Sequence, residues 1–346
     1  MIGRMFWKKS PAPVATADAI VAFWVWWQSA RAEVAAALSA GDDGRYGQAL
    51  SSAVQRMHPG LEWEVGRAGD GYRLVVTAAG APESRSTAAR WLLAAPREDS
   101  AWSYFAARQP DPVVGSGATL DIAGQRVGLS EVTVSLREWE DGPRVEATVH
   151  HRVFAALAAE ERTAVAHLLL VLALGEEDTE RWIGGLTASP EPAVEGLTLA
   201  ELPAAVAELD ERHPHAHALV NGVRPDGRPV MGIVQTRLSP VDRPLFDQHI
   251  AIAVPYRATT PAGLNPGPAG ERLRAFEDTL LELVGDEAEV PAVISADGVR
   301  TFHCYADATG GVAERIRGWR HGWPDGRVRI DVRLDPQWQA VSAYRP

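Results

Sequence analysis

Cysteine is almost absent from this sequence. Cys304 is the only one among 346 residues, so no intramolecular disulfide can form. A chain of this length can bury a sizeable core without such links. A single cysteine is typical of a reducing compartment, and we expect a cytoplasmic protein. In the alternation of a strand, Cys304 shares a face with Phe302 and Ala306, which predicts a small core residue and not a nucleophile.

Lysine is also scarce, and the 34 basic residues are outnumbered by 45 acidic ones. Lys8 and Lys9 are the only lysines, and the net charge is −11. Acids are densest over residues 160–211, where Arg162 and Arg181 are the only bases. Binding to nucleic acid or to an anionic membrane surface requires a basic face. We therefore expect neither nucleic acid nor membrane as a partner.

Long apolar runs are missing. No run approaches the 18 or more residues that a membrane span requires. Residues 1–32 resemble a secretory signal, because two lysines precede an apolar stretch over residues 19–27. However, Asp18 borders that stretch, three tryptophans crowd it, and the helical pattern continues to Leu38. We expect the segment to be part of a folded helix.

The known catalytic motifs are absent as well. There is no Walker A loop, no G-x-G-x-x-G, no H-E-x-x-H and no G-x-S-x-G. His213, His215 and His217 would share one face if they lay on a strand, as metal ligands can. Pro214 lies within this run and favours a solvated linker or strand edge. We expect no catalytic residue, no metal and no cofactor.

Three residues remain as candidates for a polar or interaction site. Glu176 follows an apolar helix expected over residues 160–174 and capped by Gly175. An acid at a helix C-terminus opposes the helix dipole, so Glu176 is either held for chemistry or simply solvated. Trp26 would face away from the apolar stripe of its helix and marks a second packing layer or a contact surface. Trp338 is the third candidate.

Hydrophobic periodicity and turn residues predict an α+β protein with mainly antiparallel sheets and helices packed on one face. The expected helices are residues 18–39, 46–57, 86–95, 160–174, 271–284 and 312–319. The capping-box spacing of Thr198 and Glu201 indicates a further short helix before Pro214, although Pro203 fits poorly in a helix that starts at Thr198. The expected strands are residues 61–67, 72–78, 102–107, 132–139, 145–151, 182–186, 216–223, 229–236, 248–254, 292–295, 299–306 and 327–334. We expect a flexible arm over residues 1–15, one domain over residues 16–212 and a second over residues 213–346.

The C-terminal third carries a resemblance. The run Ala292-Val-Ile-Ser-Ala-Asp-Gly-Val-Arg-Thr-Phe-His-Cys-Tyr305, a following helix, and Asp335-Pro-Gln-Trp338 resemble the bacterial family called domain of unknown function (DUF) 695. The resemblance covers roughly residues 213–346. Four short runs of the first half, residues 23–27, 74–80, 92–96 and 174–176, also resemble segments that accompany this domain in longer bacterial proteins. His303 and Cys304 stand where that family has aromatic residues. The order of elements is also similar to small ferredoxin-like regulatory domains, so the resemblance implies a ferredoxin-like C-terminal domain.

The resemblance implies no established activity. We therefore expect a non-enzymatic interaction or regulatory protein whose partner is another protein, with its oligomeric state left open. The alternative is a hydrolase-type enzyme with an unrecognised site that combines Glu176 and a histidine. A carboxylate and a histidine within hydrogen-bond reach in a pocket would favour the enzyme. An exposed patch around Trp26 or Trp338 would favour partner binding.

Overall fold

The computed structural model describes residues 13–42, 44–122, 124–140, 142–193, 195–223, 226–237, 239–257, 260, 268–319 and 322–344. The chain forms two compact units, Met1–Arg108 and Gln109–Pro346. Helices occur together with several mixed or antiparallel sheets, so the expected α+β class is confirmed. Within the described ranges, none of the helices combines the length and the apolar character needed to cross a bilayer.

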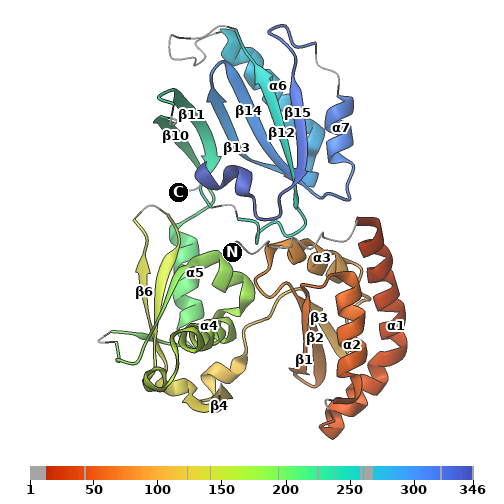
Figure 1. The fold of residues 1–346 in the computed structure, drawn as a ribbon, viewed down its shortest axis with the longest axis vertical. Helices are drawn as coiled ribbons and strands as arrows, with labels where there is room; N and C mark the ends of the chain where they lie inside the picture. Colours follow the sequence, from red (N-terminus) through yellow and green to blue (C-terminus); the bar gives the residue numbers. More distant parts are fainter. Residues whose placement is uncertain are drawn as a thin grey trace, which may run out of the picture. The chain divides into compact units, whose positions relative to one another are not determined.

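The first unit places helices against a three-stranded sheet (Figure 1). Its elements are α1 (Pro13–Ala40), α2 (Gly44–Met57), β1 (Glu62–Ala68), β2 (Gly71–Thr77), α3 (Pro82–Leu93) and β3 (Trp102–Phe105). Strands β1 and β2 are antiparallel, whereas β2 and β3 are parallel and joined through α3. Aromatic rings fill the core between them. Trp24 of α1 stacks on Trp91 of α3 at 4.8 Å, which joins the long first helix to the rest of the unit.

The first part of the second unit has a core of its own. Its main elements are β4 (Thr119–Ile122), β5 (Gln125–Gly128), β6 (Thr133–Glu138), β7 (Val145–His150), α4 (Ala159–Trp182), β8 (Ile183–Ser189), β9 (Leu197–Thr198) and α5 (Leu202–Arg212). The sheet order is β8-β7-β6-β9. The inward row of β7, with Val145, Ala147 and Val149, packs with the apolar face of α4. The hairpin of β4 and β5 was not expected from the sequence.

Helix α4 differs from the expectation at Gly175. This residue has φ 78° and ψ 172°, which interrupts the helix without ending it, and helical structure resumes to Trp182. Glu176 therefore does not lie at the C-terminal end of a helix, as the sequence suggested. It begins the next helical segment, where a negative charge is favourable to the helix dipole. The Gly175 carbonyl accepts a hydrogen bond of 2.6 Å from the Thr179 hydroxyl in this segment.

The second part of this unit is a six-stranded antiparallel sheet in the order β10-β11-β13-β14-β12-β15. Its elements are β10 (His217–Val223), β11 (Pro229–Gln235), β12 (Gln248–Pro255), α6 (Pro268–Val284), β13 (Ala288–Ala296), β14 (Val299–Ala306), α7 (Val312–Gly318), β15 (Arg329–Leu334) and the short 3-10 helix η5 (Gln339–Tyr344). The chain order β12-α6-β13-β14-α7-β15 builds the central and distal strands. The hairpin β10–β11 extends the sheet beside β13.

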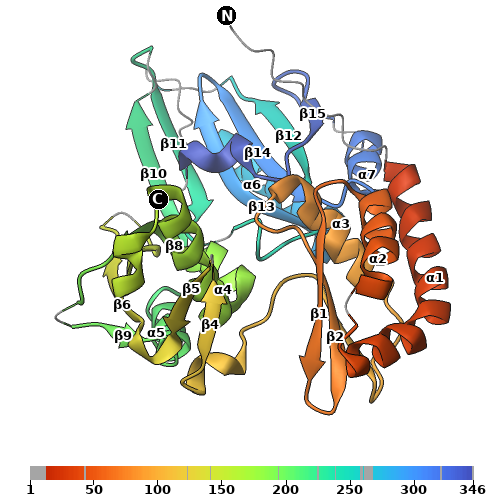
Figure 2. The same ribbon diagram turned by 60° about the horizontal axis from the view of Figure 1, so that its bottom comes forward.

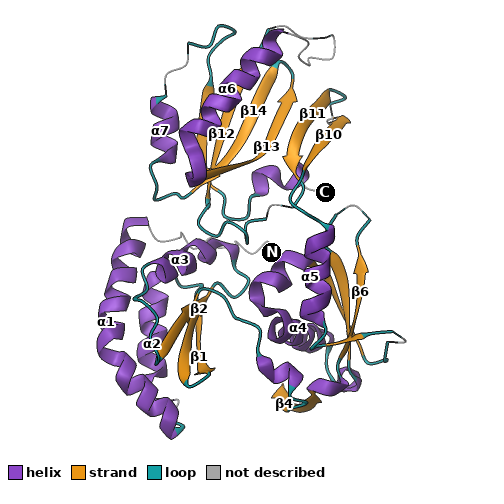
Figure 3. Ribbon diagram, turned by 180° about the vertical axis from the view of Figure 1, so that it is seen from behind, coloured by secondary structure: helices purple, strands orange, loops and turns teal. Residues whose placement is uncertain are grey.

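The two faces of this sheet are covered differently. Helices α6 and α7 pack on one, which we call the helix face, while η5 lies on the other (Figures 1 and 3). The helix face carries Phe302, Cys304 and Ala306, as the strand alternation predicted. A bulge in β13 places two residues, Val290 and Pro291, opposite one residue of β14. A proline is tolerated at such a bulge because a ladder hydrogen bond is already missing there.

The boundary expected after residue 212 lies inside the second unit, between α5 and β10. The division of the chain falls instead at Arg108 and Gln109. Sequence alternation located the sheets but did not reveal which sheets belong to one compact unit. The expected arm over residues 1–15 lies largely outside the described residues, and α1 begins at Pro13.

Candidate functional site

A groove of about 880 Å³ opens on the helix face of the C-terminal sheet. Its floor includes Ile233 of β11 and Val293 of β13, and Leu281 of α6 forms part of its wall. Ile233 lies directly opposite Val293 in the strand register, and Leu219 of β10 lies opposite Ile233. Residues directly opposite each other in antiparallel strands point to the same face. The groove therefore continues outward onto the hairpin β10–β11.

No helix among the described residues covers the hairpin's side of the helix face. Figures 2 and 3 show β10 and β11 beside the part of the sheet that carries α6. Leu219 is 75% exposed and Ile233 is 45% exposed, and Val223 and Met231 are also exposed. We call these four side chains the open lane. An uncovered row of large apolar residues beside a groove is typical of a binding surface.

The inner end of the groove is polar and leads into a second pocket of about 530 Å³. Arg181 of α4 reaches this pocket, and its Nε donates to Asp242 Oδ1 at 2.7 Å. Glu289 Oε1 accepts a hydrogen bond of 2.8 Å from Gln235 Nε2, while its Oε2 accepts one of 3.3 Å from Arg243 Nε. The contacts of Asp242 and Arg243 hold the loop between β11 and β12 at this polar end of the groove.

Two carboxylates at the pockets are electrostatically unusual. Burial raises the pKa of Glu277, which lines the groove, and the opposing positive charge of Arg300 only partly offsets this effect. Loss of water around Glu177 likewise raises the pKa of its carboxyl, although the residue is exposed, and the positive charge of Arg181 partly offsets this effect. Both groups would gain from a cation placed beside them.

The expected site residue Glu176 is half-buried at the start of the second helical segment of α4. Its neighbour Glu177 lines the second pocket, together with His215 and His217. Among the residues that the structure describes, neither histidine forms a hydrogen bond with a carboxylate there. The pair that would have favoured an enzyme is thus not formed by these residues.

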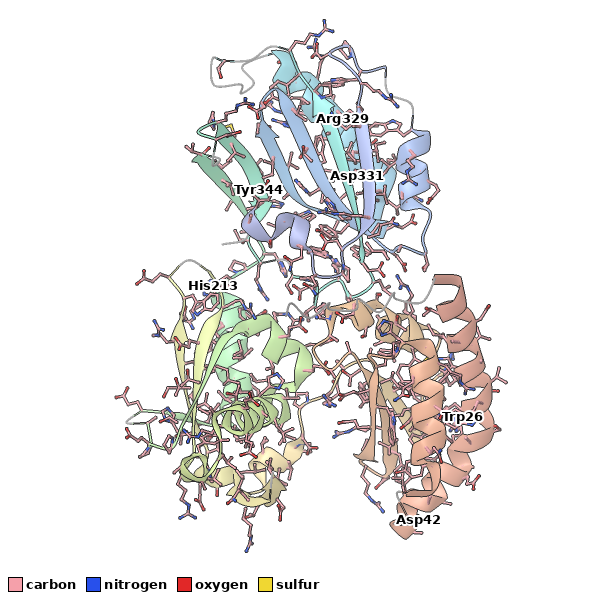
Figure 4. All side chains as sticks on the ribbon, viewed as in Figure 1. Trp26, Asp42, His213, Arg329, Asp331 and Tyr344 are labelled. Atoms are coloured by element: carbon pink, nitrogen blue, oxygen red, sulfur yellow. The ribbon has the colours of Figure 1, made fainter. Side chains whose placement is uncertain are left out.

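Trp26 lies on α1 in the first unit (Figure 4) and is half-buried. Its ring contacts Phe23 edge-on at 5.7 Å and Trp27 at 5.9 Å. Trp26 thus packs against the edge of the aromatic core and remains partly exposed, so both alternatives from the sequence stay open.

Trp338 is fully buried and offers no surface to a partner. Its ring stacks on Tyr305 at 4.2 Å, and its Nε1 donates to the Phe246 carbonyl at 2.8 Å. Asp335 completes the cluster by accepting a 2.7 Å hydrogen bond from the Tyr305 hydroxyl. The backbone of Trp338 has φ 56°, which packing holds in place despite the strain of a left-handed conformation. Trp338 thus packs the segment that follows β15 against the sheet face opposite the helices.

The three alternating histidines are not on one strand. His217 is the first residue of β10, whereas His213 ends α5 and pairs with Glu138 Oε2 at 3.3 Å (Figure 4). His215 lies between them in the connection. Within the described part of the chain, no group of three histidine, cysteine or acidic side chains is arranged to hold a metal ion.

The open lane was missed by sequence reasoning. Alternation in residues 217–223 and 229–235 already shows two apolar rows, one on each face of the hairpin. The sequence does not show that one row is covered by η5 while the other has no helix above it. Comparison with protein-family models, curated proteins and solved structures gave no match, so the resemblance to DUF695 stays a prediction.

Proposed function

We propose that this chain is an interaction protein that binds a protein partner through the groove and the open lane. One observation carries the proposal: on the helix face of the C-terminal sheet, the apolar side chains of β12, β13 and β14 pack under α6 and α7, whereas the large apolar side chains of β10 and β11 are exposed. Exposed apolar rows of this kind lower the solubility of a protein, and they are typical of surfaces that a partner covers. Enzymatic activity, the alternative, has no comparable support at Glu176.

The proposal includes the finer expectations from the sequence. We propose membership in DUF695 over roughly residues 213–346 and a ferredoxin-like core formed by β12-α6-β13-β14-α7-β15, to which the hairpin β10–β11 adds two strands. A split β-α-β-β-α-β order supports the second point. A cytoplasmic location and a regulatory role of the binding event belong to the same proposal.

Affinity capture with two matched surface variants tests the function. The full chain, Leu219→Asp and Leu334→Asp are immobilised and exposed to extract of the native cell. Both leucines are highly exposed, but Leu334 lies on β15, at the opposite edge of the sheet. We expect one set of proteins to be retained by the wild type and Leu334→Asp and lost with Leu219→Asp. Equal retention by both variants, or no reproducible partner, would refute the proposed function.

A further inference from the structure

The width of the open lane matches one helix. Neighbouring strands lie about 4.8 Å apart and a helix with its side chains is about 10 Å across, so one helix covers about two strands. Six strands therefore accommodate about three helices on one face. Helices α6 and α7 supply two of them, and the uncovered remainder is the pair β10 and β11.

The length of the open lane also matches one helix. Strand β10 has seven residues. At about 3.3 Å per residue it spans about 23 Å, which is the length of a helix of about 15 residues. An extended strand added at the free edge of β10 would leave the open lane exposed, because its backbone would lie beside the sheet and not over it. The apolar row thus favours a helix over a strand.

The groove beside the lane is acidic. Glu277 lies one helical turn before Leu281 on the flank of α6 that faces the groove, and Asp286 follows at the end of that helix. With Glu177 of the second pocket they form what we call the acidic rim. No ion pair joins these three carboxylates to another described side chain, whereas Arg181 and Arg243 are already paired with carboxylates.

We infer that the open lane receives an amphipathic helix of a partner protein, with apolar side chains on the lane and lysine or arginine side chains on the acidic rim. This inference rests on the proposed function and specifies its partner. The net charge of −11 favours the approach of such a basic segment. The raised pKa values of Glu177 and Glu277 agree with it, since a bound cation would replace the water that burial removes.

The probe is a fluorescein-labelled amphipathic peptide of about 15 residues, built from leucine and lysine with helical spacing. A second peptide has glutamate in place of lysine, and a third has a central proline that breaks the helix. Fluorescence anisotropy measures their binding to the full chain at two salt concentrations. The protein variants are Ile233→Glu, the double variant Glu277→Gln/Asp286→Asn and a control, Glu208→Gln/Glu211→Gln, which removes two exposed charges from α5.

We expect the basic peptide to bind and Ile233→Glu to weaken it by at least about tenfold, because a charge then lies in the apolar floor. The Glu277→Gln/Asp286→Asn variant should weaken it by about tenfold and reduce its salt dependence, while the α5 control should change affinity by less than about twofold. The acidic and proline peptides should not bind. Thermal unfolding followed by circular dichroism checks that each variant is folded.

Several results would overturn the inference. Equal binding of the proline peptide would indicate an extended occupant, and equal binding of the acidic peptide would remove the role of the acidic rim. A wild-type dimer that Ile233→Glu dissociates would indicate a second copy of the chain. If no peptide binds while Leu219→Asp still abolishes partner capture, the helix inference fails and the proposed function stands. If Leu219→Asp leaves partner capture unchanged, the proposed function is refuted, and the helix inference that rests on it is refuted with it.

Discussion

Mild acid is expected to destabilise the C-terminal sheet through His249 and His303. His249 of β12 is almost fully buried, and its Nε2 lies 3.0 Å from Nδ1 of His303 on β14. The two rings stack at 5.2 Å. This hydrogen bond requires one ring nitrogen to donate and the other to accept, so at least one imidazole must be neutral.

The surroundings disfavour the charged form of both rings. Burial lowers the pKa of His249 to about 4, and Arg333 of β15 adds to this effect, while Asp335 and Asp331 oppose it. Burial also lowers the pKa of His303 to about 4, with further contributions from His249 and Arg333. Two tyrosine rings complete the environment, because the ring of Tyr305 lies 5.0 Å from that of His249 and the ring of Tyr344 lies 5.8 Å from that of His303.

The sign of the pH dependence follows from these shifts. An unfolded chain binds a proton at each histidine near pH 6.5, whereas the folded sheet does so only near pH 4. Stability from the neutral pair is complete above pH 6.5 and is lost as the pH falls toward 4. A depression of this size in one histidine corresponds to about 3 kcal/mol, and because the two rings interact, the two contributions do not simply add.

Two measurements test this reasoning. The pH dependence of the imidazole Cε1–H signals by NMR reports each pKa in the folded protein. Urea unfolding from about pH 7.5 to about pH 4.5, followed by tryptophan fluorescence, reports the loss of stability. In His303→Asn, an amide that does not titrate replaces the imidazole at the position of Nδ1. The stability lost between about pH 7.5 and about pH 4.5 should therefore be smaller by about 2–3 kcal/mol than in the wild type. The exposed His215→Asn should not change it. Titration of both buried histidines near pH 6.5 would refute the argument.

Three further outcomes follow from other parts of the second unit. Trp338→Ala should lower the free energy of unfolding by about 3–5 kcal/mol in urea titrations, because it removes a fully buried ring stacked on Tyr305; a loss below about 1 kcal/mol would show that the cluster is dispensable. Gly175→Ala should cost about 1–3 kcal/mol in the same assay, since φ 78° is strained for alanine, whereas an unchanged midpoint would mean that α4 can straighten. Cys304 should resist thiol reagents in the folded chain and react once unfolded, because burial raises its pKa to about 12 and covers its sulfur; rapid labelling of the native protein would contradict this.

Local patterns in the sequence determined most of the elements. Gly298 follows Asp297 in a turn where both have positive φ, so the hairpin β13–β14 could be read from two residues. Alternation placed Phe302 and Cys304 on one packed face because the period of a strand is two residues. The prediction that Gly175 ends the helix is wrong, because helical structure resumes after it; a glycine can end a helix or kink it, and the local sequence does not distinguish the two.

The site was decided by tertiary structure. Trp338 appeared to be a surface candidate because its burial depends on Tyr305 and Phe246, which are distant in sequence. The open lane depends on the order of strands in the sheet, which places β10 and β11 at an edge that none of the helices in the described ranges covers. Composition had already fixed the acidity and the single cysteine. Only the packing of helices on the sheet determined which apolar row is buried in the core and which remains exposed to a partner.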